Sequence, residues 1–424
     1  MLRPDGRTAS AALAPWSRRE AAPLAGVLLI GIAIRVVLLP ASGLRGDIDQ
    51  FVLWIHGIAV DGLSNAYDRN VSFPPVMVYI WGLLAALQPA FQTVTDGSDP
   101  AIRALMKLPA TLADLGLALV AAYALRAQPR WALIAAAAIL VHPAVIYVSA
   151  WWGQYESVYL LPALAAAVLA INGRNGWAAA AIAVALMTKP QALPLLVPFA
   201  AWFWATGGTR ELARAAAIGA AVIVVLWIPF LAAGGPATYL LNLAEYQGGV
   251  FAVASLRAWN AWWLVQEVFS GGRFIVDGSA ILGPLTLRHL GYVVAGSLEL
   301  LVAAAILRDP RPRTFILGLA VSVLVAFSFL TTMHERYAYG AVVFLVLLIA
   351  DRRVRYLGIA FGVTFSLNLA AAIPPSDEVG ALLPVSGGLG VVGSASMLAI
   401  TLVALLLLLG ANADRAAASP APSR

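Results

Sequence analysis

The sequence has no cysteine and few charged residues, and each of these absences excludes a class of protein. Without cysteine, the chain can form no disulfide, no thiolate metal site and no cysteine nucleophile. Its four histidines are scattered without metal-ligand spacing, which argues against a dedicated zinc site. Charged residues make up only 11% of the 424 residues, whereas 61% are hydrophobic. This composition excludes a soluble globular protein.

Apolar residues form many runs of about 15 to 20, the length at which a helix crosses a bilayer. The first run begins near Pro23, and no small-residue cleavage site follows it, so we expect it to be kept as the first membrane helix. The sequence therefore predicts an all-α integral membrane protein with about 12 transmembrane helices, within a range of 11–13. The expected spans are 22–40, 104–125, 131–149, 157–171, 176–188, 192–205, 213–232, 288–307, 314–330, 338–350, 355–373 and 389–410.

One further apolar stretch, at about residues 74–91, decides the predicted topology. If it crossed the membrane, five arginine-bearing loops would face the side opposite to the arginine-rich N-terminus. If it does not cross, these loops lie in the cytoplasm with both termini, as the positive-inside rule requires. We therefore expect the stretch, which begins Phe73-Pro74-Pro75, to lie in or dip into the outer interface. The loops carry Arg126 and Arg130; Arg174; Arg210 and Arg214; Arg308, Arg311 and Arg313; and Arg352, Arg353 and Arg355.

This topology also fixes the predicted organisation of the chain. We expect cytoplasmic tails at 1–21 and 411–424 and a single transmembrane domain over 22–410, in the cell (plasma) membrane. A first external loop with interfacial helices spans 41–102, and a long external loop spans 233–287. The net charge of +6 lies in short loops rather than in a basic domain, so it marks topology and does not support nucleic-acid binding.

The first external loop contains two carboxylates, Asp47 and Asp49, just before an expected amphipathic surface helix. That helix is indicated by apolar residues at helical spacing, which include Phe51, Trp54 and Ile58. Either aspartate alone is explained as a helix N-cap, and this is the favoured role for Asp49. The functional alternative is a general base, because an attacking hydroxyl needs a carboxylate to take its proton.

A polar segment from Trp151 to Glu156 follows the third expected span. The tryptophans Trp151 and Trp152 are typical of an aromatic belt at the membrane interface. Glu156 is harder to explain structurally, because acidic residues within membrane helices are costly. We expect it to bind substrate hydroxyls or a cation.

Lys107 and Lys189 are the only two lysines of the chain, and both lie at or within spans. Lys107 shares one face of its helix with Arg103 and Asp114, but Asp114 is too far along the helix for a direct bridge. Snorkelling and internal hydrogen bonds are the structural explanation for Lys107. Two further intramembrane charges, Arg35 and Glu299, are expected to face the bundle interior.

The corner His334-Glu335-Arg336 places an acid between two potential cations, where a lipid phosphate would lie. Such cations can stabilise a departing phosphate, although a solvated corner with a local Glu-Arg pair explains the same residues. In the long external loop, the cluster that begins Trp259-Asn260 could stack on a sugar or anchor the loop to the membrane. Anchoring is the favoured role.

In their order along the chain, these motifs resemble the multi-spanning glycosyltransferases of the GT-C class, from about residue 30 to 350. They are most similar to the dolichyl-phosphate-glucose-dependent glucosyltransferases of N-glycan assembly and to the mannosyltransferase that adds the second mannose of GPI anchors. The resemblance implies a GT-C type bundle. It is carried by Gly46-Asp47-Ile48-Asp49 with Trp54, Phe73-Pro74-Pro75, Lys107 with Asp114, Gly153-Gln154-Tyr155-Glu156-Ser157, Lys189-Pro190-Gln191, Trp259-Asn260 and His334-Glu335-Arg336.

The resemblance implies an inverting hexosyltransferase that moves mannose or glucose from polyprenyl phosphate to a lipid-linked or glycan acceptor on the outer face. The first-loop aspartate of the family is its catalytic base, which corresponds to Asp47, with Asp49 at a second acidic position. Arg336 stands where the glucosyltransferases have lysine, and this departure leaves both sugars open. Donor phosphate binding is expected from Lys189, Arg336, His334, Lys107 and Arg103. Sugar or acceptor binding is expected from Gln154, Glu156, Gln191, Glu335 and Trp259.

No cofactor is expected to be required, although a divalent metal remains possible in this class, with Asp47, Asp49 and Glu156 as its ligands. The expected partners are the polyprenyl-phosphate sugar, the acceptor and membrane lipids. The alternative is a secondary transporter or flippase for a polar or lipid-linked substrate, which also uses intramembrane charges. Against it, the sequence shows no internal repeat, and its distinctive polar residues lie at one set of helix ends.

Overall fold

The computed structural model describes residues 18–410, and for residues 18–20 and 250 it describes the backbone alone. The predicted tails therefore lie outside the described residues, apart from 18–21, which begin helix α1 (Arg18–Leu38). Within the described part, helices dominate and the strands are only two or three residues long. An all-α membrane fold is thus confirmed, and its physical reason is that a helix satisfies its backbone hydrogen bonds without water.

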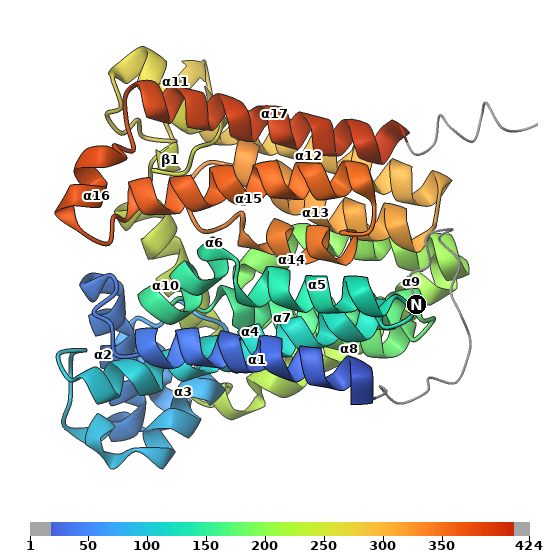
Figure 1. Ribbon diagram of the computed structural model, residues 1–424. Helices are drawn as coiled ribbons and strands as arrows, with labels where there is room; N and C mark the ends of the chain where they lie inside the picture. Colours follow the sequence, from blue (N-terminus) through green and yellow to red (C-terminus); the bar gives the residue numbers. More distant parts are fainter. Residues whose placement is uncertain (1–17, 411–424) are drawn as a thin grey trace, which may run out of the picture. The chain divides into compact units, whose positions relative to one another are not determined.

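The chain divides into two compact units. The N-terminal unit comprises residues 18–193 and 214–252 of the described chain, and the C-terminal unit comprises 194–213 and 253–410. Helix α9 (Leu196–Trp227) contributes to both units and is kinked at Gly208, whose φ is 66°. Figure 1 shows the helices of each unit in sequence colours.

The other elements of the N-terminal unit are α2 (Arg45–Asp61), η1 (Leu63–Arg69), α3 (Pro75–Leu87), η2 (Pro89–Gln92), α4 (Pro100–Leu125), α5 (Pro129–Leu140), α6 (Pro143–Ile146), η3 (Tyr147–Trp152), α7 (Glu156–Ile171), α8 (Asn175–Leu186), η4 (Pro190–Leu195), η5 (Ile228–Phe230), α10 (Gly235–Glu245) and η6 (Tyr246–Val250). The C-terminal unit contains β1 (Ser255–Leu256), α11 (Ala261–Ser270), β2 (Ala280–Leu282), β3 (Leu285–Thr286), α12 (Leu287–Arg308), α13 (Pro312–Phe329), β4 (Met333–His334), α14 (Tyr339–Leu347), α15 (Arg352–Ala372), α16 (Asp377–Leu382) and α17 (Gly388–Gly410).

Seven helices of the described chain are long and apolar enough to cross a membrane, or up to eight if one bent pair forms a single span. The predicted number of about 12 spans is therefore not confirmed. One reason is length, because α7 has 16 residues, α8 has 12 and α14 has nine, fewer than the ~20 that a straight span requires. The predicted spans 192–205 and 213–232 both fall within one candidate, Pro190–Phe230, but the backbone of α9 is non-helical at Gly208, which lies between the two predicted spans. The bent pair is Pro129–Leu140 with Pro143–Trp152, at 46°.

Helix α3 corresponds to the apolar stretch on which the predicted topology depends. It begins at Pro75, where the missing proline N–H costs no helical hydrogen bond, and it ends after 13 residues. At about 1.5 Å per residue such a helix is ~20 Å long, short of a ~30 Å hydrocarbon core. The length of α3 agrees with the prediction that this stretch does not cross the membrane.

The predicted amphipathic helix is confirmed as α2, whose apolar side is buried in the core of the N-terminal unit. The ring of Phe51 packs 5.1 Å from that of Tyr155, and Trp54 packs 5.5 Å from Trp81 on α3. Full burial of one such side chain stabilises by roughly 1.5–3 kcal/mol. This aromatic cluster fixes α2 against the start of α7, next to the polar residues of the candidate site.

Candidate active site

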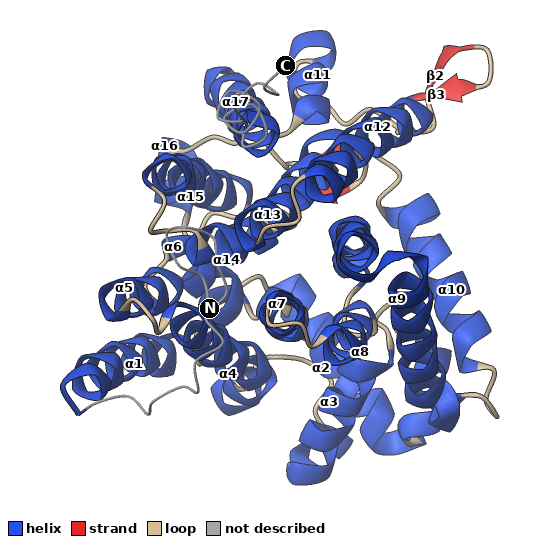
Figure 2. Cartoon of the chain, turned by 90° about the vertical axis from the view of Figure 1, so that its right-hand side faces the viewer, coloured by secondary structure: helices blue, strands red, loops and turns tan. Residues whose placement is uncertain are grey.

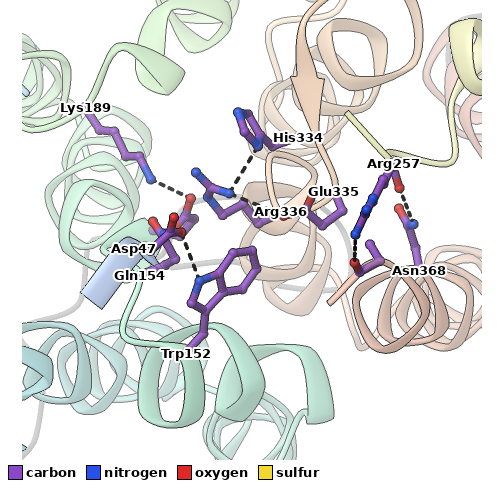
Figure 3. Close-up of polar contacts among 11 residues, drawn as sticks. Asp47, Trp152, Gln154, Lys189, Arg257, His334, Glu335, Arg336 and Asn368 are labelled. Carbon is purple, nitrogen blue, oxygen red and sulfur yellow. Dashed lines mark hydrogen bonds and ion pairs between the residues drawn. The ribbon is translucent and has the colours of Figure 1, made fainter. Parts of the chain in front are cut away.

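Asp47 lies in the first turn of α2, where the helix dipole interacts favourably with a negative charge. The prediction that the two carboxylates precede this helix is wrong, because the helix already begins at Arg45 and Leu44 occupies the N-cap without a side-chain bond. The Oδ2 atom of Asp47 accepts hydrogen bonds from Trp152 Nε1 at 3.1 Å and from Gln154 Nε2 at 2.5 Å (Figure 3). Oδ1 accepts no bond from any described residue. One carboxylate oxygen is held and the other is left for a ligand.

Of the two donors to Asp47, Trp152 is the last residue of a π-helical segment, η3, and Gln154 follows its C-cap, Gly153. The backbone N–H groups of Gly153 and Gln154 both donate to the carbonyl of Val148. Gly153 adopts a φ of 93°, and a Cβ there would meet the Cγ of Lys107 at 3.0 Å, so only glycine fits without strain. Trp152 is buried and bonded to Asp47, so the predicted belt role for it is wrong.

Lys107 and Arg103 bind backbone carbonyls. Lys107 Nζ donates to Ala41 at 2.7 Å and to Trp151 at 2.6 Å, as the structural explanation predicted. Arg103 donates to Pro40, and its other contacts are the carbonyls of residues 97 and 98. Lys107 therefore joins the loop before α2 to the turn that carries the donors to Asp47, whereas Arg103 joins it to the loop before α4. Their contacts are structural and differ from the phosphate-binding role expected for them.

Asp49 supports the loop that precedes α4. Its Oδ1 accepts from the backbone N–H of Gly97 at 2.8 Å and lies 3.2 Å from Arg45 NH2, an i,i+4 pair. The predicted capping role of Asp49 is therefore wrong, since it lies within α2 and binds a loop distant in sequence. Asp49 is thereby matched in charge to Asp47 but differs from it in its contacts.

Glu156 and Lys189 form a buried ion pair, with Lys189 Nζ 2.5 Å from Glu156 Oε1 and side-chain exposures of 4% and 1%. The ammonium also lies 5.6 Å from the centre of the Phe73 ring, within cation-π range. Gln154 lies two residues before Glu156, and Gln191 lies two residues after Lys189. The Oε1 atoms of both glutamines are buried and accept no hydrogen bond from described residues. Buried acceptors without a donor are costly, which makes these two amides candidates for binding hydroxyl groups.

A second buried network links the helices behind the site. Arg35 of α1 contacts Asp114 of α4 through Nε and NH2, both at 2.8 Å, and also donates to the carbonyl of Leu140 at the end of α5. Ser149 and Ser157 donate to the same carboxylate. Arg35 thus faces the bundle interior, as predicted. The serines were missed, because a serine in an apolar run is equally compatible with bonding to its own helix.

The His334-Glu335-Arg336 corner belongs to the C-terminal unit. The prediction placed it in a simple loop after a span, but Met333 and His334 form strand β4, which pairs in parallel with β1. Two residues are too few for a periodic signal, so the pattern could not reveal this strand. The NH1 atom of Arg336 lies 3.3 Å from Glu335 Oε1 and 3.3 Å from His334 Nδ1 (Figure 3). Glu335 is buried, so the corner is not the solvated one that was the structural alternative.

Trp259 lies in the core of the C-terminal unit. Its indole is 1% exposed, donates from Nε1 to the carbonyl of Val385 and packs with Trp263 and Ala371. Its backbone N–H donates to Asn368 of α15, whose amide in turn donates to the carbonyl of Arg257. The predicted membrane anchoring and sugar stacking are both incompatible with this burial.

The three carboxylates proposed as metal ligands do not gather around a common point. Asp47 is bonded to Trp152 and Gln154, Asp49 to Arg45 and a backbone amide, and Glu156 to Lys189. Between residues 18 and 410, no group of three acidic or histidine side chains is arranged to hold a metal ion. The contacts of these three carboxylates do not fit a divalent metal site.

No protein-family model matches the chain, and no curated protein matches it either. The chain is similar to ArnT from Cupriavidus metallidurans bound to undecaprenyl phosphate, with 16% sequence identity and a TM-score of 0.48, over 93% of this chain and 78% of that chain. A likeness this low in both identity and TM-score assigns the chain to no family.

Proposed function

We propose that the chain is an inverting GT-C type glycosyltransferase that moves a hexose, mannose or glucose, from polyprenyl phosphate to a lipid-linked or glycan acceptor. The observation that carries this proposal is Asp47, whose Oδ2 is held by Trp152 and Gln154 while Oδ1 accepts no bond from the described residues. A base for a hydroxyl must be oriented and must keep one oxygen available. The arginine-bearing loops support an active site on the external face of the cell membrane, with both termini in the cytoplasm.

In the proposed reaction, Asp47 Oδ1 takes the proton of an acceptor hydroxyl as the oxygen forms a bond to the anomeric carbon. The bond between that carbon and the phosphate oxygen breaks, and polyprenyl phosphate leaves with the electron pair. The configuration inverts, because attack and departure take place on opposite faces of the sugar. Polyprenyl phosphate is the released product, and no nucleotide sugar is required.

The remaining roles follow from the contacts of each candidate. We assign the departing phosphate to Arg336 and His334, because a guanidinium and an imidazole can both donate to phosphate oxygens. Lys107 and Arg103 are assigned to structure, since backbone carbonyls accept their hydrogen bonds. For hydroxyl groups of the sugar or acceptor we propose the amides of Gln154 and Gln191, and the carboxylates of Glu156 and Glu335. Trp259 is removed from this set because it is buried in the core.

The direct test measures transfer by the purified protein in lipid nanodiscs. Polyprenyl-phosphate mannose and polyprenyl-phosphate glucose are supplied as donors, with membrane lipids as acceptors. We expect the wild type to use one donor and Asp47→Asn to lose about 10²-fold to 10⁴-fold in rate. Asp49→Asn is the matched control and is expected to stay within a few-fold of wild type, because the polar contacts of Asp49 within the described residues are with Arg45 and Gly97.

Two results would contradict the proposal. Full transfer by Asp47→Asn would remove Asp47 as the base. No transfer by the wild type from any prenyl-phosphate sugar, together with uptake of a polar or lipid-linked substrate into proteoliposomes, would establish the transporter or flippase instead.

A further inference from the structure

The strands β2 and β3 form a small hairpin immediately before α12. Ala280 pairs with Thr286 and Leu282 with Leu285 in antiparallel register, with an irregularity at the intervening residue. Gly283 in the turn adopts a φ of 56°, which glycine tolerates. In Figure 2, the hairpin projects sideways from the end of α12, away from the neighbouring helices of its own unit.

The side chains of this hairpin are large, apolar and exposed. Ile281 is 47% exposed, Leu282 77% and Leu285 37%. The sequence from 278 to 287 contains no charged residue. Hairpins that face water carry charges or lie against other elements, since an exposed apolar edge promotes aggregation. The composition of the hairpin therefore indicates an apolar surrounding.

The base of the hairpin is held firmly to the first turn of α12. Arg288 donates from Nε and NH2 to the two oxygens of Asp277, each at 2.7 Å. Thr331 also donates to Asp277, a fully buried residue, at 3.0 Å. The backbone N–H of Leu287 donates to the carbonyl of Ser279, and the N–H of Arg288 to that of Asp277. These bonds fix the position of the hairpin relative to the helix that follows it.

The helix that follows the hairpin, α12, indicates what surrounds the hairpin. Helix α12 is a candidate membrane span of 22 residues, and only 28% of its apolar window is buried. Tyr292, Val293 and Leu300 are exposed along it, so this helix presents an apolar surface to its surroundings. The exposed leucines of the hairpin continue this surface at the helix end, where Arg288 and Tyr292 are side-chain types typical of a membrane interface.

We propose that the hairpin of residues 279–287 is a membrane anchor that inserts Ile281, Leu282 and Leu285 into the acyl chains of the bilayer beside α12. In this proposal, lipid contacts the exposed face of α12, and the same lipid layer contacts the hairpin beside the helix. The anchor pins the segment that links α11 to α12 at the membrane surface. It does not depend on the proposed transfer reaction.

The chain has no cysteine, so single cysteines can be introduced without removing others. We would spin-label Leu282→Cys in lipid nanodiscs and compare collisions with oxygen, which concentrates in lipid, and with a water-soluble nickel chelate. Val293→Cys, on the exposed face of α12, is the lipid reference, and Ser98→Cys, in an exposed loop, is the water reference. Leu282→Cys replaces one exposed side chain and is not expected to impair folding.

If the hairpin is a membrane anchor, the spin label at position 282 collides several-fold more often with oxygen than with the nickel chelate, as the label at position 293 does. A label at 282 that is as accessible to nickel as one at 98 would overturn the proposal. Shielding from both reagents would also overturn it, because the hairpin would then be covered by protein, such as a second copy of the chain.

Discussion

Gln154 donates a 2.5 Å hydrogen bond from Nε2 to Oδ2 of Asp47, and the two residues are 107 positions apart in the chain. Lys107 bonds the carbonyls of Ala41 and Trp151 and so joins the segments that precede the two residues. Gln154 is therefore a positioning residue for the candidate base.

We expect Gln154→Leu to lower kcat about 10-fold to 100-fold, because a base that loses its orienting donor spends less time in the reactive geometry, and to raise KM as well, because the Oε1 acceptor proposed for a hydroxyl group is also lost. Trp152→Phe removes the second, longer hydrogen bond and is expected to have a smaller effect. Steady-state kinetics at saturating donor measure both. Gln92→Leu, at an exposed position, is the control. An unchanged kcat for Gln154→Leu would show that this bond does not serve catalysis.

The buried pair of Lys189 and Glu156 gives a prediction for stability. Removing one partner takes away the 2.5 Å ion-pair contact of a buried charge, and breaking a buried pair in this way costs about 3–5 kcal/mol. We therefore expect Lys189→Met and Glu156→Gln each to lower the melting temperature clearly, and the double variant to recover most of the loss. Thermal unfolding in detergent measures this double-mutant cycle.

The same variants separate structure from donor binding. A double variant that is stable but inactive would assign Lys189 or Glu156 a role at the substrate, whereas a stable and active one would limit the pair to structure. The exposed pair of Asp61 and Arg69 also has a 2.5 Å contact, and Asp61→Asn is expected to change the melting temperature little. An equal drop in melting temperature at the buried and the exposed pair would contradict the importance of burial.

Gly393 of α17 packs against the indole of Trp259. A Cβ at this position would lie closer than 3.0 Å to the indole ring, which is held by its bond to Val385. We expect Gly393→Ala to destabilise the C-terminal unit by about 1–3 kcal/mol through overpacking. Gly296→Ala on α12 meets no atom within 4 Å and is the control, with stability unchanged or slightly raised. A neutral Gly393→Ala in thermal unfolding would show that Trp259 can move.

Asp351, between α14 and α15, gives a prediction for pH. Burial raises the pKa of this carboxyl, but the hydrogen bond and charge of Arg313, 2.8 Å away, together with backbone N–H groups, outweigh burial and hold the pKa below its ordinary value. A depressed folded pKa contributes stability above the unfolded pKa of about 3.9, and the contribution is lost as pH falls through the folded value.

The measurement compares wild type with Asp351→Asn, which keeps a capping side chain for α15 but loses the charge. We expect the wild type to melt at a higher temperature by a constant margin between pH 5 and 7, and the margin to shrink below about pH 4. If the difference in melting temperature between wild type and Asp351→Asn grew at low pH, the pKa of Asp351 would be raised and not lowered, which would contradict the role of Arg313.

Part of the fold was predictable because it depends on local composition. The apolar runs predicted helices at α1, α4, α12, α13, α15 and α17, since a membrane helix satisfies its own backbone. Phe73-Pro74-Pro75 predicted where α3 begins, and its short length agrees with the expected interfacial position. The predicted number of spans is not confirmed, because hydropathy measures apolar content and does not give the length of each helix, such as the 12 residues of α8.

By itself, then, the sequence determined that the chain is a helical membrane protein and which polar residues are out of place in it, because lipid admits few charges and no unpaired backbone. It did not determine how those residues pair. Only the tertiary structure decided that Lys107 binds carbonyls, that Lys189 neutralises Glu156, and that Trp152 and Gln154 orient Asp47. Each contact joins segments tens of residues apart, and a side chain's partner is set by the packing that brings its segment there, which no local pattern records.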